Sequence, residues 1–250
     1  MRRKSILIVI ILVLTGVMCF AGWKIWEIQS EYSSGESAYE KIEHYATFPS
    51  SEEPAGETAE PSAYAWPVVD FDVLQATNPD VVGWIYLKDS KINYPIVQGS
   101  DNSYYLNHLF TKERNSAGCI FLDSRNSKDF SDRNNVVYGH HMKNGSMFTG
   151  LEAYKTQAFY DAHPIVQILT QDQNYELELF AGYVTEVEDD AWQLGFTEPE
   201  FEKWLGKAVN RSAFASTVTP TADDRVVTLS TCSYEFDNAR FVVHGILKQQ

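Results

Sequence analysis

The stretch Val226-Val227-Thr228-Leu229-Ser230-Thr231-Cys232 is an apolar run that ends in a cysteine and is followed by a polar turn. Short runs rich in valine, isoleucine and aromatic residues, separated by turn residues, are typical of β-strands. Comparable runs recur at 83–87, 94–97, 119–122, 135–138, 165–170, 175–183, 225–231 and 241–248. About eight short strands at this spacing predict an all-β barrel or sandwich.

Helical segments interrupt these strands. Thr197-Glu198-Pro199-Glu200 has the form of a capping box, and apolar residues follow at helical spacing as far as Asn210. Shorter helices are expected at 69–76 and around Met147, Leu151 and Tyr154. The sequence contains no G-x-G-x-x-G or Walker loop and no long βαβ alternation, which argues against a nucleotide site.

The N-terminal 26 residues combine a basic end with an apolar segment. Arg2, Arg3 and Lys4 precede a stretch, 5–23, that carries no charge and is long enough to cross a bilayer as a helix. Basic residues before such a helix favour a cytoplasmic N-terminus, with the rest of the chain outside the cell membrane. The alternative is a cleaved signal peptide, but no clear A-x-A site follows the apolar run. We therefore expect 1–26 to be a single-pass signal anchor.

Residues 27–66 carry nine acidic residues against a single lysine, and the part at 49–61 is rich in proline, glutamate, serine and alanine. This composition is typical of a solvated spacer, so we expect an acidic extracytoplasmic tether ahead of one globular domain at 67–250. The net charge of the whole chain is −14. It argues against nucleic acid as a partner, because phosphate contacts need a basic face. With three cysteines and no C-x-x-C spacing, we expect neither a metal site nor a cofactor.

Cys232 is the first candidate for chemistry. A strand end that opens into a loop exposes a side chain while the sheet holds its position. Arg240 begins the next predicted strand eight residues later, so a hairpin would bring it back beside the thiol. A guanidinium stays protonated and cannot act as a base, but it can donate hydrogen bonds to a carbonyl oxygen that gains negative charge.

His140 is the second candidate, because it follows the predicted strand 135–138 and Gly139. An imidazole at a strand end can give a proton to a leaving amine and take one from an incoming amine. His141 is its rival for the role of base. The remaining histidines lack supporting context and are interpreted as structural: His44, His108, His163 and His244.

Three separated motifs closely resemble the class B sortases: 137–148 around Gly139-His140, 228–232 ending in Cys232, and 240–244 beginning with Arg240. The resemblance covers roughly 69–247. It implies an eight-stranded sortase-type β-barrel with N-terminal helices and a helix between strands six and seven, where the capped 198–210 segment falls. Many relatives have Gly-His-Asn where this chain has Gly139-His140-His141, and Gly139 places His140 at the family position.

The resemblance also implies roles for individual residues. His140, Cys232 and Arg240 match the catalytic triad of the family. The positions that line the substrate groove in relatives are occupied here by Asn102, Leu106, Tyr138 and Ser230. A different resemblance involves Ser116-Ala117-Gly118-Cys119, which is similar to the Ser-His-Gly-Cys motif of L,D-transpeptidases but lacks the histidine. Cys119 is therefore expected to be an inward-facing strand residue.

By family resemblance, the protein is a membrane-anchored cysteine transpeptidase. It would cleave a C-terminal sorting signal of the Asn-Pro-x-Thr or Ser-Pro-x-Thr type after threonine, form a thioester, and transfer the secreted protein to a peptidoglycan amine. Its partners would then be sorting-signal proteins, a peptidoglycan precursor or cross-bridge amine, and the membrane. Two alternatives stay open: a cysteine peptidase that uses water as acceptor, and a catalytically silent β-domain that binds surface proteins.

Overall fold

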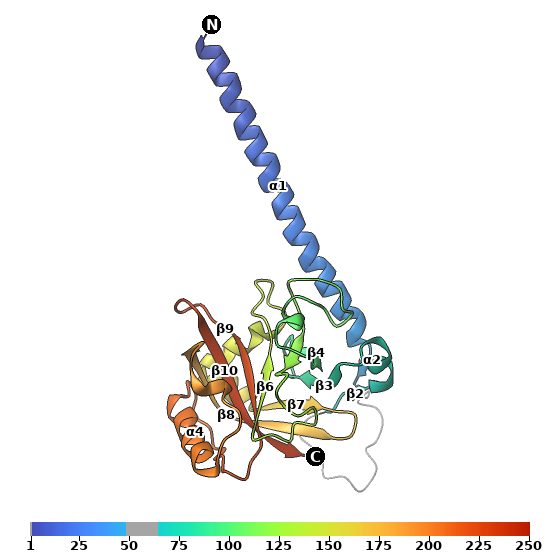
Figure 1. Ribbon diagram of the computed structural model, residues 1–250, viewed down its shortest axis with the longest axis vertical. Helices are drawn as coiled ribbons and strands as arrows, with labels where there is room; N and C mark the ends of the chain where they lie inside the picture. The colour runs from blue at the N-terminus through green and yellow to red at the C-terminus, as the bar shows by residue number, and fades with distance from the viewer. Residues whose placement is uncertain (1, 49–64) are drawn as a thin grey trace.

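The computed structural model describes residues 2–48 and 65–250. The proline-rich part of the expected spacer, 49–61, lies outside the described residues. Eight strands close into a barrel in the order β10-β8-β7-β3-β4-β5-β6-β9 (Figure 1). Their bounds are β3 (Val81–Tyr86), β4 (Asn93–Val97), β5 (Ile120–Leu122), β6 (Asn134–Tyr138), β7 (Ile165–Leu169), β8 (Asn174–Glu186), β9 (Val226–Cys232) and β10 (Ala239–Gln249). The eight predicted strands are confirmed. Because the strand order is closed, the fold is a barrel and not a sandwich.

Most neighbouring strands are antiparallel, but β4–β5 and β6–β9 are parallel. The core inside the barrel is made of large apolar side chains such as Trp84, Ile96 and Leu229, none of which is exposed. Strand β9 is buried on both faces over most of its length, which explains its continuous apolar sequence. The barrel thus holds the end of β9 in a fixed position.

Helix α4 (Glu198–Arg211) covers part of the outer face of the barrel. Its Phe201, Trp204 and Leu205 pack in one apolar cluster with Val226 and Val242. The predicted capping box is present, since the Thr197 backbone N–H donates to Glu200 Oε2 at 2.9 Å. The helix lies between β8 and β9, the sixth and seventh barrel strands, where the family resemblance placed it.

The remaining elements connect and flank the barrel strands. They are α1 (Arg2–Glu43), β1 (Ala46–Thr47), β2 (Val68–Val69), α2 (Phe71–Thr77), η1 (Tyr104–Leu106), η2 (Phe148–Lys155), α3 (Gln157–Ala162) and η3 (Asp190–Trp192). Both short helices expected from the sequence are present, as α2 and as the 3₁₀ segment η2. The pair β1 and β2 forms a separate two-stranded sheet.

Helix α1 extends from the barrel as one long helix (Figure 1). Its apolar part, from Ile6 onward, is exposed and is long and apolar enough to cross a membrane, a property that signal sequences share. The helix runs past residue 26 into the segment that was expected to be a solvated spacer. Its last turns are docked on the barrel domain, where Tyr39 and Ile42 are buried.

Polar contacts explain why this part of α1 adheres to the domain. The Ser116 backbone N–H donates to Glu31 Oε1 at 2.8 Å, and Asn115 Nδ2 donates to the Glu31 carbonyl at 2.9 Å. The Tyr39 hydroxyl donates to the Gly118 carbonyl at 2.5 Å. Residues 31–47 of the expected spacer are therefore packed against the domain.

Candidate active site

His140 and Cys232 lie at the same edge of the barrel because β6 and β9 run parallel. The ladder ends with Tyr138 paired to Ser230, and the Gly139 N–H donates to the Ser230 carbonyl at 3.1 Å. His140 and Cys232 each follow this pair by two residues. Because side chains of a strand alternate between its faces, residues two apart share a face. All four side chains line one pocket.

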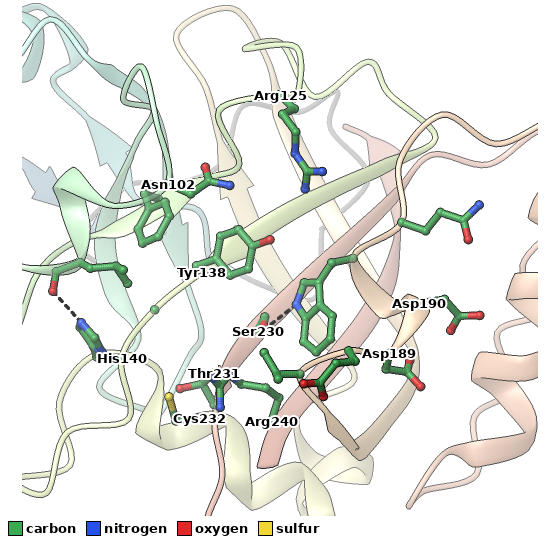
Figure 2. A pocket seen from close by; sticks show the side chains of 17 residues that line it. Asn102, Arg125, Tyr138, His140, Asp189, Asp190, Ser230, Thr231, Cys232 and Arg240 are labelled. Carbon is green, nitrogen blue, oxygen red and sulfur yellow. Dashed lines mark hydrogen bonds between the residues drawn. The ribbon is translucent and has the colours of Figure 1, made fainter. Parts of the chain in front are cut away.

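Arg240 reaches the same edge from the other side of Cys232. Strands β9 and β10 form an antiparallel hairpin in which Arg240 is the direct partner of Cys232, as predicted from the sequence. The Ser233 N–H closes the hairpin by donating to the Ala239 carbonyl at 2.9 Å. Cys232 is a half-buried free thiol. Figure 2 shows its sulfur between His140 and Arg240.

The ring of His140 is held by a backbone group. Its Nε2 lies 2.7 Å from the carbonyl oxygen of Leu106, which follows Tyr104 and Tyr105 in η1 (Figure 2). A carbonyl oxygen can only accept, so Nε2 carries the hydrogen of this bond. In the neutral imidazole, Nδ1 is then the nitrogen without a proton. This contact selects the tautomer that leaves Nδ1 available to accept a proton.

Gly139 allows His140 to lie this close to the barrel. A Cβ atom at Gly139 would lie 2.5 Å from Ile120 Cδ1 and 2.7 Å from Phe148 Cδ2, closer than real side chains approach. The Phe148 N–H also donates to the His140 carbonyl at 2.9 Å, so the same residue that crowds Gly139 holds the backbone of His140. A larger residue would push the strand end outward and displace His140 with it.

The pocket has a volume of about 560 Å³. It brings together the seven residues singled out in the sequence: Asn102, Leu106, Tyr138, His140, Ser230, Cys232 and Arg240. Hydrogen bonds orient several of them. Asn102 Oδ1 accepts from the Ser124 N–H at 2.7 Å, and the Tyr138 hydroxyl donates to Asp123 Oδ2 at 3.0 Å.

Comparisons with known proteins agree with this architecture. Residues 85–248 match the Sortase domain family. Sortase B of Listeria monocytogenes is 37% identical over 240 residues, covering 94% of each chain. Sortase B of Staphylococcus aureus is 32% identical over 246 residues, covering 97% of each. The chain belongs to the class B sortases. This sortase is accordingly a cysteine transpeptidase.

Solved structures of relatives share its fold. Sortase B of Bacillus anthracis, in complex with AAEK1, has a TM-score of 0.73 and 32% identity, covering 89% of this chain and all of the other. The S. aureus sortase B–substrate complex has a TM-score of 0.69 and 35% identity, covering 72% and 84%. The S. aureus protein has also been solved with triglycine, with a TM-score of 0.68, 35% identity and coverage of 72% and 85%.

One wall of the pocket in this sortase was not predicted from the sequence. It is formed by the loop between β8 and α4, which contributes Val187–Asp190, Trp192 and Gln193. The Trp192 Nε1–H donates to Ser230 Oγ at 2.9 Å, so the loop is bonded to β9 beside the reactive edge (Figure 2). The sequence does contain a signal for this wall, because Trp192 follows a run of acidic residues and a tryptophan side chain, with an apolar ring and a polar N–H, is suited to a binding surface.

Arg125 was also missed, and it lines the pocket beside Tyr138. Its guanidinium forms two hydrogen bonds to the carboxylate of Asp123, at 2.9 and 2.7 Å. Burial raises the pKa of Asp123, but the hydrogen bonds from Arg125, Asn102 and Tyr138 outweigh it and bring the pKa to about 2. Asp123 is therefore ionised at neutral pH and holds both Tyr138 and Arg125 at the wall of the pocket.

His141 and Cys119 lie apart from the pocket in this sortase. Of the described residues, those that line the pocket include His140 but not His141. The His141 ring packs against Tyr234, and its Nε2 lies 3.5 Å from Glu152 Oε2. Cys119 is buried, as expected, but it immediately precedes β5, which begins one residue later than the predicted strand 119–122. Burial raises the pKa of its thiol to about 12, which keeps it protonated.

His244 is buried, as its structural interpretation requires. It is hydrogen-bonded to the Thr228 hydroxyl at 2.9 Å and to the Tyr183 hydroxyl at 3.1 Å. Burial lowers its pKa to about 3, so the ring stays neutral in the core.

Proposed function

We propose that this sortase uses Cys232 as the nucleophile to cleave the peptide bond that follows the threonine of a C-terminal sorting signal. The observation that carries the proposal is the meeting of three side chains, from β9, β10 and the end of β6, at one pocket. Cys232 supplies a thiol, His140 a proton acceptor and donor, and Arg240 a fixed hydrogen-bond donor for an oxyanion. The pairing of Arg240 with Cys232 supports this role, because it makes the two residues direct neighbours in the hairpin.

The proposed first half-reaction forms a thioester. His140 first takes the proton of the Cys232 thiol, and the resulting thiolate Sγ bonds to the threonine carbonyl carbon. The carbonyl oxygen takes the negative charge while Arg240 donates hydrogen bonds to it. The oxyanion then collapses and the C–N bond breaks. His140 gives its proton to the departing amine nitrogen, which leaves with the C-terminal fragment. The acyl group stays on Cys232.

In the second half-reaction, an amine of the peptidoglycan attacks the thioester. His140 removes a proton from the attacking nitrogen, the new C–N bond forms, and the C–S bond breaks to regenerate the Cys232 thiolate. The S. aureus relative solved with triglycine supports a glycine-type amine as the acceptor. The carboxylate of Glu188 at the pocket also favours the approach of a cationic amine, whereas Asp189 and Asp190 are paired with Arg211 and Lys207.

The proposed substrate is a peptide of the Asn-Pro-x-Thr or Ser-Pro-x-Thr type on a secreted protein. The S. aureus sortase B–substrate complex supports binding of a substrate in this fold. Helix α1 would hold the enzyme at the cell membrane as a single-pass anchor, with its N-terminus in the cytoplasm. Since α1 continues into the part docked on the barrel, it would place the catalytic domain at the extracellular face.

The acceptor distinguishes a transpeptidase from a peptidase. We expect full-length protein in detergent to hydrolyse fluorogenic peptides containing Asn-Pro-Ala-Thr or Ser-Pro-Ala-Thr slowly. Added triglycine should convert most of the product to the threonyl-triglycine adduct, because the thioester is partitioned between water and amine. Liquid chromatography with mass detection measures both products. An unchanged yield of free acid at saturating triglycine would support the peptidase, and absence of cleavage of either peptide would support a binding domain.

A further inference from the structure

A cluster of charged and polar side chains lies next to the proposed catalytic residues but outside the pocket. The Lys155 cluster consists of His141, Glu152, Lys155, Ser233 and Glu235. Lys155 Nζ lies 2.7 Å from Glu152 Oε1, 2.5 Å from Glu235 Oε1 and 3.0 Å from Ser233 Oγ. His141 Nε2 lies 3.5 Å from the other carboxylate oxygen of Glu152.

The cluster contacts the chain neighbour of each proposed catalytic residue. Its member His141 follows His140, and its member Ser233 follows Cys232. Lys155 Nζ also lies 5.3 Å from the ring centroid of Phe241, the residue after Arg240. Two side chains of η2, Lys155 and Glu152, thus join the segment after His140 to the hairpin that carries Cys232 and Arg240.

The charges of the cluster are held in place. The side chains of Lys155 and Glu152 are 27% and 30% exposed, so their contacts are partly shielded from water. Burial lowers the pKa of Lys155, but hydrogen bonds to Glu152 and Glu235 outweigh this and raise the pKa. Burial raises the pKa of Glu235, and hydrogen bonds from Lys155 and Ser233 bring it down to about 2. Linked charge-assisted bonds of this kind hold their partners more firmly than isolated surface pairs do.

We infer that the Lys155 cluster positions His140, Cys232 and Arg240 relative to one another, an inference that rests on the proposed function. The cluster acts through neighbouring residues. Within the described part of the chain, none of its five members lines the pocket. Without Lys155, the carboxylates of Glu152 and Glu235 repel each other across Ser233. The loop after Cys232 then moves away from η2 and takes the thiol with it.

Replacing the cation tests the inference. In full-length protein, Lys155→Met should lower kcat for the Asn-Pro-Ala-Thr peptide at saturating triglycine by about 10- to 100-fold, because a displacement of about 1 Å costs about 100-fold in rate. KM for the peptide should stay within about twofold, since the pocket wall is intact. Lys155→Arg should recover kcat to within about threefold, because it restores the charge and the donors.

The matched control is Lys248→Met. Lys248 also forms an ion pair, with Asp224 at 2.6 Å, but it lies eight residues along β10 from Arg240, about 26 Å away at 3.3 Å per residue. We expect kcat for this variant to equal that of the wild type. Wild-type kcat in a folded Lys155→Met protein, or a loss of the same size in Lys248→Met, would overturn the inference.

Two further variants keep the test decisive. Glu235→Gln changes a side chain that is 40% exposed on the hairpin loop, so the fold should survive. It should lower kcat by about 3- to 10-fold, the equivalent of one ordinary hydrogen bond, and an unchanged kcat contradicts the inference even if Lys155→Met does not fold. Cys232→Ala, assayed in parallel, separates the two proposals. If it stays active, the proposed function fails; if it is inactive while Lys155→Met and Glu235→Gln are fully active, only the positioning inference fails.

Discussion

Replacing Cys232 with alanine is expected to lower cleavage of the sorting peptide by at least about 10⁴-fold, as removal of a catalytic nucleophile does. The substitution removes a half-buried thiol at the end of β9 and leaves the rest of the pocket in place. Because the barrel ladder uses backbone groups, the free energy of unfolding should change little. Initial rates of peptide cleavage, followed by chromatography, measure the effect.

The control for this prediction is Cys119→Ala. The Cys119 thiol is buried beside the Tyr39 hydroxyl at 3.2 Å, under the docked end of α1. Its loss should cost about 1 kcal/mol of stability through the altered contact with Tyr39 and leave the cleavage rate close to that of the wild type. If Cys119→Ala is inactive while Cys232→Ala cleaves normally, the nucleophile has been assigned to the wrong cysteine.

Replacing His140 with alanine should lower kcat by about 10²- to 10⁴-fold, the range for general acid–base groups. The variant removes the imidazole whose Nε2 is bonded to the Leu106 carbonyl, so no group remains to protonate the leaving amine. The loss should appear in both half-reactions. Single-turnover measurements of acylation, and of thioester transfer to triglycine, resolve the two.

His141 offers the sharpest comparison for this prediction. His141→Asn introduces the residue that many relatives have after the histidine and alters a side chain outside the pocket. Its kcat should exceed that of His140→Ala by at least about tenfold, on the same acid–base argument. His163→Asn, at the end of α3, should match the wild type. A greater loss in His141→Asn than in His140→Ala would transfer the role of base to His141.

The strands, the hairpin and the capped helix could be predicted, because each depends on a local sequence pattern. Short runs rich in valine, isoleucine and aromatic residues located the barrel strands, and the short separation of Cys232 from Arg240 in the chain predicted their pairing in a hairpin. The capping box at Thr197 located the inserted helix. Each of these depends on residues close together in the chain.

The features set by distant contacts were not predictable from local patterns. The parallel register of Tyr138 with Ser230 joins strands separated by a long stretch of chain, and only the closed barrel determines it. The bond between Trp192 and Ser230 depends on the same closure. The acidic residues after 26 resemble those of a solvated spacer, yet Glu31 accepts a hydrogen bond from the Ser116 N–H. Composition does not reveal such a partner.

The central claim is that Cys232 carries the acyl group between the two half-reactions. The most direct test is the intact mass of the full-length enzyme during turnover of the Asn-Pro-Ala-Thr peptide without amine, followed by digestion at low pH. We expect a mass increase equal to the peptide up to its threonine, located on the fragment that contains Cys232 and lost when triglycine is added. An active enzyme with no adduct, or with the adduct on Cys119, would contradict the account.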